Sequence, residues 1–196
     1  NGMQEDFPTP ARISLYGASK SASEPLILEY AECFNFPVWI NRCGVLAGAG
    51  QFGKADQGIF SYWIHSFREK KPLKYIGFDG TGHQVRDALH PKDLVPLLFQ
   101  QMISPDKDAP KIINLGGGIK NSMSLKDLSF WCADRFGENR VNASSETRPM
   151  DAPWIIMDSS TAQNVWNWKV QIKIDQLLNE IAQHAEQNPN WLDLTK

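Results

Sequence analysis

Tyr16 and Lys20 are the residues of this chain whose types and spacing most directly suggest chemistry. They lie four positions apart in the stretch LYGASK at 15–20, which we expect to open a helix running to about Glu32. Residues four apart on a helix project from one face, one turn apart. A lysine ammonium at that distance favours the ionised form of a tyrosine, as any nearby opposite charge does. The pair can therefore act as a general base near neutral pH, with Lys20 also able to bind a ribose hydroxyl, although Tyr-x-x-x-Lys alone also occurs on ordinary helix surfaces.

Two arginines are candidates for binding an anionic substrate. Arg86 follows a Gly-rich turn on an expected short strand, and Asp87 beside it could hold the guanidinium in place. Arg148 is followed by Pro149 and lies three residues before Asp151. A planar guanidinium matches the oxygens of a phosphate, and two separated arginines are what a diphosphate requires. On its own, an arginine beside an acid more often forms an ordinary surface ion pair, and neither arginine shows a diphosphate site alone.

The stretch Gly48–Gly53 fits the pattern G-x-G-x-x-G of a dinucleotide-binding turn. In such a turn the last glycine leads directly into a helix, whose N-terminus meets the pyrophosphate. Here 54–58 separates Gly53 from the next expected helix, and Asp79 comes later than the expected spacing of about 20 residues. We therefore expect a substrate-facing loop, in which Gln51 and Phe52 are candidate substrate contacts.

Composition and charge exclude several function classes. The chain has 196 residues, of which 42% are hydrophobic, enough for one sizeable core. Its 20 basic and 22 acidic residues are well mixed and leave a net charge of −2, so no basic stripe is present for nucleic acid. No apolar run approaches the length of a membrane span. We expect neither a nucleic-acid nor a membrane partner.

The cysteines and histidines suggest neither a disulfide nor a metal site. Cys33, Cys43 and Cys132 are odd in number and far apart, without a C-x-x-C spacing. We expect reduced thiols in a cytoplasmic protein. The histidines lack the spacing of metal ligands, so we expect no bound metal; they are His65, His83, His90 and His184.

Hydrophobic periodicity, punctuated by Gly and Pro, predicts strands alternating with helices, which is typical of the α/β class. Ser124 is the expected N-cap of one helix, and Pro91 suits the start of another. We expect helices over 15–32, 59–70, 91–102, 125–136, 159–164 and 174–186. We expect strands over 38–43, 73–76, 84–89, 111–115 and 143–147, the second and third flanking the turn at 77–82.

In order and spacing, these motifs resemble the second half of an extended short-chain dehydrogenase/reductase of the NAD-dependent sugar-nucleotide epimerase/dehydratase family. The matching stretches are YGASK at 16–20, NRC at 41–43, VRD at 85–87, RPMD at 148–151 and WNWK at 166–169. The amino-acid sequences of 42–53 and 57–63 are most similar to those of the family's 2-epimerases of CDP-sugars. Many relatives carry Asn, contacting the sugar nucleotide, where this chain has Val45.

The resemblance implies the C-terminal part of a Rossmann-type NAD(P)-binding domain, followed by a small α/β substrate-binding domain. Residues 1–58 would end the Rossmann-type domain, and 59–196 would be mainly substrate-binding, with 91–118 returning to the Rossmann sheet. The family's dinucleotide fingerprint and catalytic Ser or Thr do not precede Tyr16 here. We therefore expect the chain to be a fragment that is inactive alone, from an enzyme that forms homo-oligomers.

The same resemblance implies a cofactor site for NAD. Tyr16 would take the proton from a sugar hydroxyl as its carbon gives hydride to NAD, and the hydride would return to the other face. Lys20 would hold the nicotinamide ribose and favour the ionised tyrosine. Cys43 and Gly44, just past a strand, would lie near the nicotinamide.

The implied substrate is a nucleotide-diphosphate sugar, and a CDP-sugar is suspected. Arg86 and Arg148 would grip the diphosphate, with Asp151 nearby on the nucleotide side. A 4-epimerase or a 4,6-dehydratase of the same family remains an alternative. A non-catalytic NAD-fold binding module is another, although such a module would have no need of both Tyr16 and Lys20.

Overall fold

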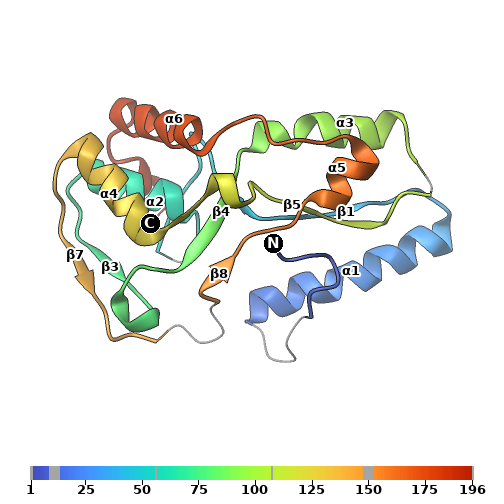
Figure 1. The fold of residues 1–196 in the computed structure, drawn as a ribbon, viewed down its shortest axis with the longest axis horizontal. Coiled ribbons are helices and arrows are strands. Elements are labelled where there is room, and N and C mark those ends of the chain that lie inside the picture. The colour runs from blue at the N-terminus through green and yellow to red at the C-terminus, as the bar shows by residue number, and fades with distance from the viewer. Residues whose placement is uncertain (1, 9–13, 56, 107, 148–151, 196) are drawn as a thin grey trace.

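The computed structural model describes residues 2–8, 14–55, 57–106, 108–147 and 152–195 (Figure 1). Helices and strands alternate along this length and form an α/β fold, as the sequence predicts. Arg148 and Asp151, two predicted substrate-binding residues, lie outside the described residues. Within the described part, no helix combines the length and the apolar character needed to span a membrane.

One group of elements surrounds a parallel pair of strands. β1 (Ile40–Cys43) and β5 (Ile112–Leu115) pair along their whole lengths. Figure 1 shows α1 (Leu15–Phe34) on one side of the pair, with α3 (Val95–Ile103) and α5 (Ser160–Trp166) on the other. Buried apolar side chains form the core of this group: Leu89, Leu97, Ala109, Ile113, Leu115, Ala162, Trp166 and Trp168.

A second group of strands is arranged around β4 (Val85–Leu89). This strand pairs in parallel with β2 (Val45–Leu46) and β8 (Trp154–Ile155), and antiparallel with β6 (Ser122–Ser124). Beside them, β3 (Leu73–Tyr75) pairs in parallel with β7 (Val141–Ala143). Short 3-10 helices occur at Phe78–Gly80, Pro91–Asp93, Ile119–Asn121 and Trp191–Thr195.

Three helices pack together around the core of the second group. They are α2 (Ile59–Arg68), α4 (Leu125–Phe136) and α6 (Ile174–Gln187), drawn together at one end of the molecule in Figure 1. The central helix α2 buries apolar side chains at the helical spacing, as the sequence predicts. Its contribution to the core is Phe60, Trp63, Ile64 and Phe67, which pack with Leu128, Leu177, Leu178 and Ile181.

The start of α4 is fixed locally, and the sequence predicts it correctly. Ser124 Oγ accepts a hydrogen bond from Asp127 N at 3.0 Å, and the Asp127 carboxylate accepts one from Ser124 N at 3.1 Å. This capping box satisfies two backbone donors that a helix start otherwise leaves unpaired.

Several elements differ from the sequence-based expectation. The predicted helix over 91–102 divides into the 3-10 turn Pro91–Asp93 and α3, and the strand predicted near 143–147 lies earlier, at β7. The strands predicted on either side of the turn at 77–82 do form, as β3 and β4, and each pairs with other strands. β2, β6 and β8 are not predicted, because strands of two or three residues carry no periodicity of their own.

The first described residues run beside a distant part of the chain. Met3 pairs in parallel with Met157, with Met3 N donating to Ile156 O at 2.7 Å and Asp158 N donating to Met3 O at 2.9 Å. The Glu5 carboxylate accepts a hydrogen bond from Asn114 N of β5 at 2.9 Å. The segment therefore bridges β5 and the chain that follows β8.

Candidate active site

Tyr16 and Lys20 lie on one face of α1, in its first two turns. Ser14 caps this end of the helix, accepting a hydrogen bond from Gly17 N at 3.1 Å. The Lys20 ammonium lies 5.6 Å from the centroid of the Tyr16 ring. Tyr16 is 65% exposed, so a ligand can reach the pair.

An ion pair joins α1 to β1 close to these residues. Arg42 donates from Nε and Nη2 to the two carboxylate oxygens of Glu24, at 2.7 and 2.6 Å. The hydrogen bond to Glu24 is the main cause that raises the pKa of Arg42. Because Glu24 lies one helical turn after Lys20, the bidentate pair fixes this part of α1 against the carboxyl half of β1.

Cys43 and Gly44 lie where β1 ends and the chain passes close to Asp87. Gly44 N donates to Leu115 O at 2.7 Å, which extends the pairing of β1 with β5. A Cβ atom at Gly44 would lie 2.8 Å from Asp87 Oδ1, and one at Gly116 would overlap Oδ2. Glycine at both positions therefore makes room for a buried carboxylate at the carboxyl ends of these strands.

Asp87 does not hold the Arg86 guanidinium, so that sequence-based expectation is wrong. Adjacent residues of a strand point to opposite faces. The buried Asp87 carboxylate instead accepts hydrogen bonds from Gly118 N at 3.1 Å and Met157 N at 3.2 Å. Burial raises the pKa of Asp87, and these amide donors partly oppose that shift.

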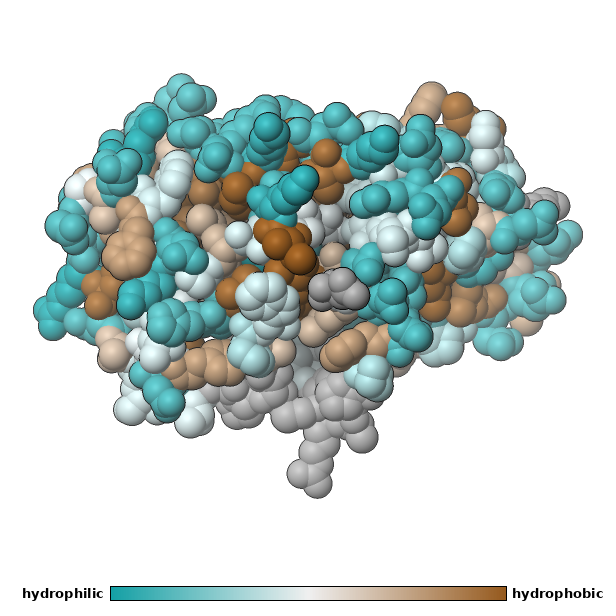
Figure 2. Space-filling model, viewed as in Figure 1, coloured by the Kyte–Doolittle hydropathy of each residue, from teal (hydrophilic) through white to brown (hydrophobic). Residues whose placement is uncertain are grey.

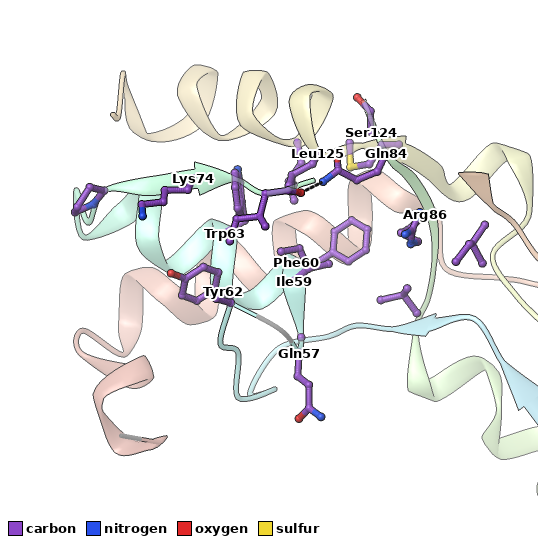
Figure 3. A pocket seen from close by; sticks show the side chains of 18 residues that line it. Gln57, Ile59, Phe60, Tyr62, Trp63, Lys74, Gln84, Arg86, Ser124 and Leu125 are labelled. Atoms are coloured by element: carbon purple, nitrogen blue, oxygen red, sulfur yellow. Dashed lines mark hydrogen bonds between the residues drawn. The ribbon is translucent and has the colours of Figure 1, made fainter. Parts of the chain in front are cut away.

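Arg86 lines a pocket of about 730 Å³ between α2, the start of α4 and strands β3 and β4 (Figure 3). Its Nη1 donates to the carbonyl oxygen of Val85 at 2.7 Å. Phe60 and Trp63 provide apolar and aromatic lining from α2, and Lys74 adds a second cationic side chain from β3. The pocket thus combines aromatic surface with positive charge.

The sequence-based reasoning missed most of this lining. Gln84 lies two residues before Arg86, and the period of two along a strand could have indicated that both face one way. Tyr62, Lys74 and Ser124 come from three separate segments, and no local signal brings them together. Of the predicted site residues that the structure describes, Arg86 is the one that lines this pocket.

Gln51 and Phe52 lie outside the lining of this pocket. The Gln51 amide donates from Nε2 to Leu46 O at 2.9 Å, and the Phe52 ring stacks on Trp191 at 4.8 Å between centroids. From the same loop, Gln57 and Gly58 do line the pocket. The loop therefore borders the site through its second half.

The thiols and the possible metal ligands show no further site. Cys33, Cys43 and Cys132 are free thiols, and burial raises the pKa of both Cys43 and Cys132. Among the residues that the structure describes, no three His, Cys, Asp or Glu side chains are grouped to hold a metal ion.

The model of the NAD dependent epimerase/dehydratase family matches residues 2–116. The chain belongs to this family. Because residues 2–116 are more than half of the chain, the match confirms the family that the motifs of the sequence resemble. The NAD-dependent epimerase/dehydratases use NAD, the cofactor that the sequence predicts.

Two curated relatives are epimerases of nucleotide sugars by name. The CDP-paratose 2-epimerase of Salmonella typhi is 29% identical over 178 residues, which are 88% of this chain and 51% of that protein. The UDP-glucuronate 4-epimerase of Thermodesulfobacterium geofontis (strain OPF15) is 27% identical over 188 residues, 95% of this chain and 54% of that protein. The chain spans about half the length of these relatives.

Solved structures of the NAD-dependent epimerase/dehydratases share the fold. The dTDP-glucose 4,6-dehydratase DesIV from Streptomyces venezuelae, with NAD and TYD bound, gives a TM-score of 0.84 at 19% identity, over 100% of this chain and 58% of that chain. The UDP-glucuronic acid 4-epimerase from Bacillus cereus, in complex with UDP-glucuronic acid and NAD, gives a TM-score of 0.80 at 23% identity. That match covers 95% of this chain and 57% of the epimerase chain. These likenesses confirm the predicted Rossmann-type α/β class.

Proposed function

We propose that this chain forms the catalytic and substrate-binding half of an NAD-dependent nucleotide-sugar epimerase. The observation that carries the proposal is the Tyr16–Lys20 pair, exposed on one face of α1 in a chain of this family. We favour 2-epimerisation of a CDP-sugar as the activity, since the sequence of 42–53 and the similarity to the Salmonella relative both support it. We assign 1–58 and 91–118 to the Rossmann-type part and the remainder mainly to the substrate-binding part.

Tyr16 acts as the acid and base of this reaction. It removes the proton from a sugar hydroxyl and later returns it, and the Lys20 ammonium favours the ionised tyrosine. When bound, the nicotinamide cofactor supplies hydride transfer. Lys20, Cys43 and Gly44 hold the nicotinamide end, at the carboxyl end of β1.

The described residues fit the nicotinamide end of the cofactor better than its pyrophosphate. Tyr16 is exposed, and Gly44 brings backbone without a side chain to the same end of the sheet. The Gly48–Gly53 loop does not lead directly into a helix N-terminus, because α2 begins only at Ile59, so it lacks the arrangement that binds a pyrophosphate in a dinucleotide turn. We therefore propose that the chain alone is inactive and that the whole enzyme supplies the pyrophosphate site elsewhere.

The pocket beside Arg86 receives the nucleotide diphosphate of the substrate. Its volume of about 730 Å³ lies within the range of small-molecule sites, roughly 300–1,000 Å³. Arg86 contacts a phosphate, while the half-buried Tyr62 of the same lining offers ring surface to the base or sugar. Arg148 and Asp151 remain proposed contacts on the nucleotide side.

A 4-epimerase is the second candidate, because the Thermodesulfobacterium relative aligns over 95% of this chain. A 4,6-dehydratase shares the same tyrosine chemistry but also needs an Asp-Glu pair, which this family carries ahead of the tyrosine. Identifying the sugar product of the whole enzyme by NMR, with CDP-sugars and UDP-sugars as substrates, distinguishes these activities, since the product is inverted at C2, inverted at C4, or has lost water.

Substituting Tyr16→Phe tests the central assignment. In the whole enzyme we expect turnover of a CDP-sugar to fall by at least about 100-fold, the scale of a lost general acid–base, while NAD still binds. Steady-state rates and a fluorescence titration with NAD measure the two effects. Tyr30→Phe is the matched control, since Tyr30 is also exposed on α1. Activity of Tyr16→Phe within a few-fold of the parent would contradict the proposal.

A further inference from the structure

Trp191 lies against the loop that borders the pocket. Its ring stacks face to face on Phe52, with 4.8 Å between centroids and 6° between planes. Its Nε1 donates to Gln51 O at 3.3 Å, and His184 of α6 meets the ring edge-on at 4.6 Å. Trp191 therefore contacts both the backbone and a side chain of the loop.

Two closely packed glycines, Gly53 and Gly58, connect Phe52 with the part of the loop that lines the pocket. Phe52 O lies 2.6 Å from the position of a Cβ at Gly58, which has φ +65°, and Gly53 packs against the first turn of α2. Between these glycines, Lys54 N donates to Gln57 O at 2.8 Å, and Gln57 N donates to Lys54 O at 3.1 Å. A shift of Phe52 would therefore move Gln57 and Gly58, which line the pocket (Figure 3).

The segment that carries Trp191 has its own attachment to the end of α2. Asn190 N donates to Glu69 Oε1 at 2.8 Å, and the Lys71 ammonium lies 2.5 Å from Glu69 Oε2 and 3.1 Å from Asp193 Oδ1. Leu192 is buried. The segment is thus fixed at a second point, and Trp191 can act as a rigid support for the loop.

We propose that Trp191 is a positioning residue for the nucleotide pocket, holding the described loop residues 51–55 and 57–58 in the shape that accepts the substrate. The inference rests on the proposed function, since it takes the pocket to be the nucleotide site. An unsupported loop must be ordered when the ligand binds, and ordering a side chain or loop costs affinity. Trp191 lowers that cost because it orders the loop in advance.

The test is the affinity of this chain for CDP, because the described residues contain the pocket. We expect Trp191→Ala to raise the Kd for CDP about 10-fold in isothermal calorimetry, at a temperature where circular dichroism shows both proteins folded. Trp191→Phe keeps a ring to stack on Phe52 and should restore Kd to within about 3-fold of the parent. Leu194→Ala, an exposed change in the same segment, is the matched control and should leave Kd unchanged.

The kinetics of the whole enzyme provide a second readout. Trp191→Ala should raise KM about 10-fold and leave kcat within about 2-fold, since the loop shapes binding and not the proton transfer. If Trp191→Ala lowers the melting temperature but leaves Kd and KM unchanged, the residue is only structural and the inference is wrong. If the parent chain binds neither CDP nor UDP, the pocket assignment itself fails, and the inference fails with it.

Discussion

Arg86 and Asp87 are neighbours in the sequence with different roles in the structure. Arg86 lines the pocket, whereas Asp87 is buried and accepts backbone hydrogen bonds from Gly118 and Met157. The charge of the guanidinium, its hydrogen-bonding geometry and the preceding turn make Arg86 a candidate phosphate ligand in the sequence. The partners of Asp87 lie 31 and 70 positions away, so no local pattern could have indicated them.

Removing the Arg86 guanidinium should weaken nucleotide binding more than it slows the chemistry. For Arg86→Ala we expect a loss of about 1.5–3 kcal/mol, roughly a 10- to 150-fold rise in Kd for CDP, as for other charge-assisted contacts. The same change is expected for Arg148→Ala. Calorimetry with CDP measures both. Arg140→Ala is the control, because Arg140 is exposed and lies outside the pocket lining. Unchanged affinity for CDP in both Arg86→Ala and Arg148→Ala would show that neither arginine binds the diphosphate.

Helices are the elements that the sequence predicts best here. The spacing of Phe60, Trp63, Ile64 and Phe67 predicts α2, and Ser124 predicts the start of α4, because both signals are local. β2 and β8 each consist of two residues and exist because each pairs with part of β4, at Ala88–Leu89 and at Val85–Arg86 respectively. Each short strand forms only through its pairing with the distant β4, so periodicity along the sequence could not predict either one.

The contact between α2 and α6 contains a histidine pair that links stability to pH. His65 of α2 is fully buried, and its Nε2 lies 3.4 Å from Nδ1 of His184 on α6. Burial, and next the neighbouring His184, lower the pKa of His65 to about 4. The other charged groups that act on it lie at the end of α2 and just beyond, and these are Glu69, Arg68 and Lys71.

Acid should therefore weaken this helix contact. His65 stays neutral in the folded chain but takes up a proton near its ordinary pKa when unfolded, so the unfolded state binds more protons between these two values. The free energy of unfolding should fall as pH decreases below about 6.5, by about 2 kcal/mol on reaching about pH 5. Urea titrations of the parent and His65→Gln at both pH values measure it. The decrease in unfolding free energy with falling pH should become smaller in His65→Gln and remain in His83→Gln, whose site is exposed. An unchanged decrease in His65→Gln would show that His65 is not its origin.

At the scale of the whole molecule, much apolar surface remains uncovered. Ala31 is the buried residue of α1, and hydrophobic side chains reach the surface in the middle of the face in Figure 2 and toward the end where α1 lies. The exposed large hydrophobic residues of α1 and α3 include Leu15, Leu26, Tyr30, Phe34, Val95, Phe99, Met102 and Ile103. Patches beyond a few hundred Å² commonly mark interaction surfaces.

We expect the 196-residue chain to form dimers or larger assemblies and not to bind NAD. Self-association would cover the apolar side chains of α1, and the Gly48–Gly53 loop does not lead directly into a helix N-terminus that could bind the pyrophosphate. Sedimentation equilibrium and an NAD titration test the two parts. Combining Leu26→Lys with Phe34→Lys should shift the chain toward monomer, whereas Lys126→Glu on α4 should not. A monomer that binds NAD at micromolar concentration would show that the Gly48–Gly53 loop is a dinucleotide site.

The pairing of Met3 with Met157 has a consequence for how the chain folds during its synthesis. The first described segment also bonds to Asn114, so its partners leave the ribosome long after it does. Contacts so distant in sequence must wait for loop closure, and such topologies fold slowly. Until residues near Met157 emerge, β5 lacks part of its covering, and the nascent chain exposes apolar surface that chaperones recognise. A ribosome-bound chain should therefore gain protease resistance only once the tunnel has released the segment around Met157.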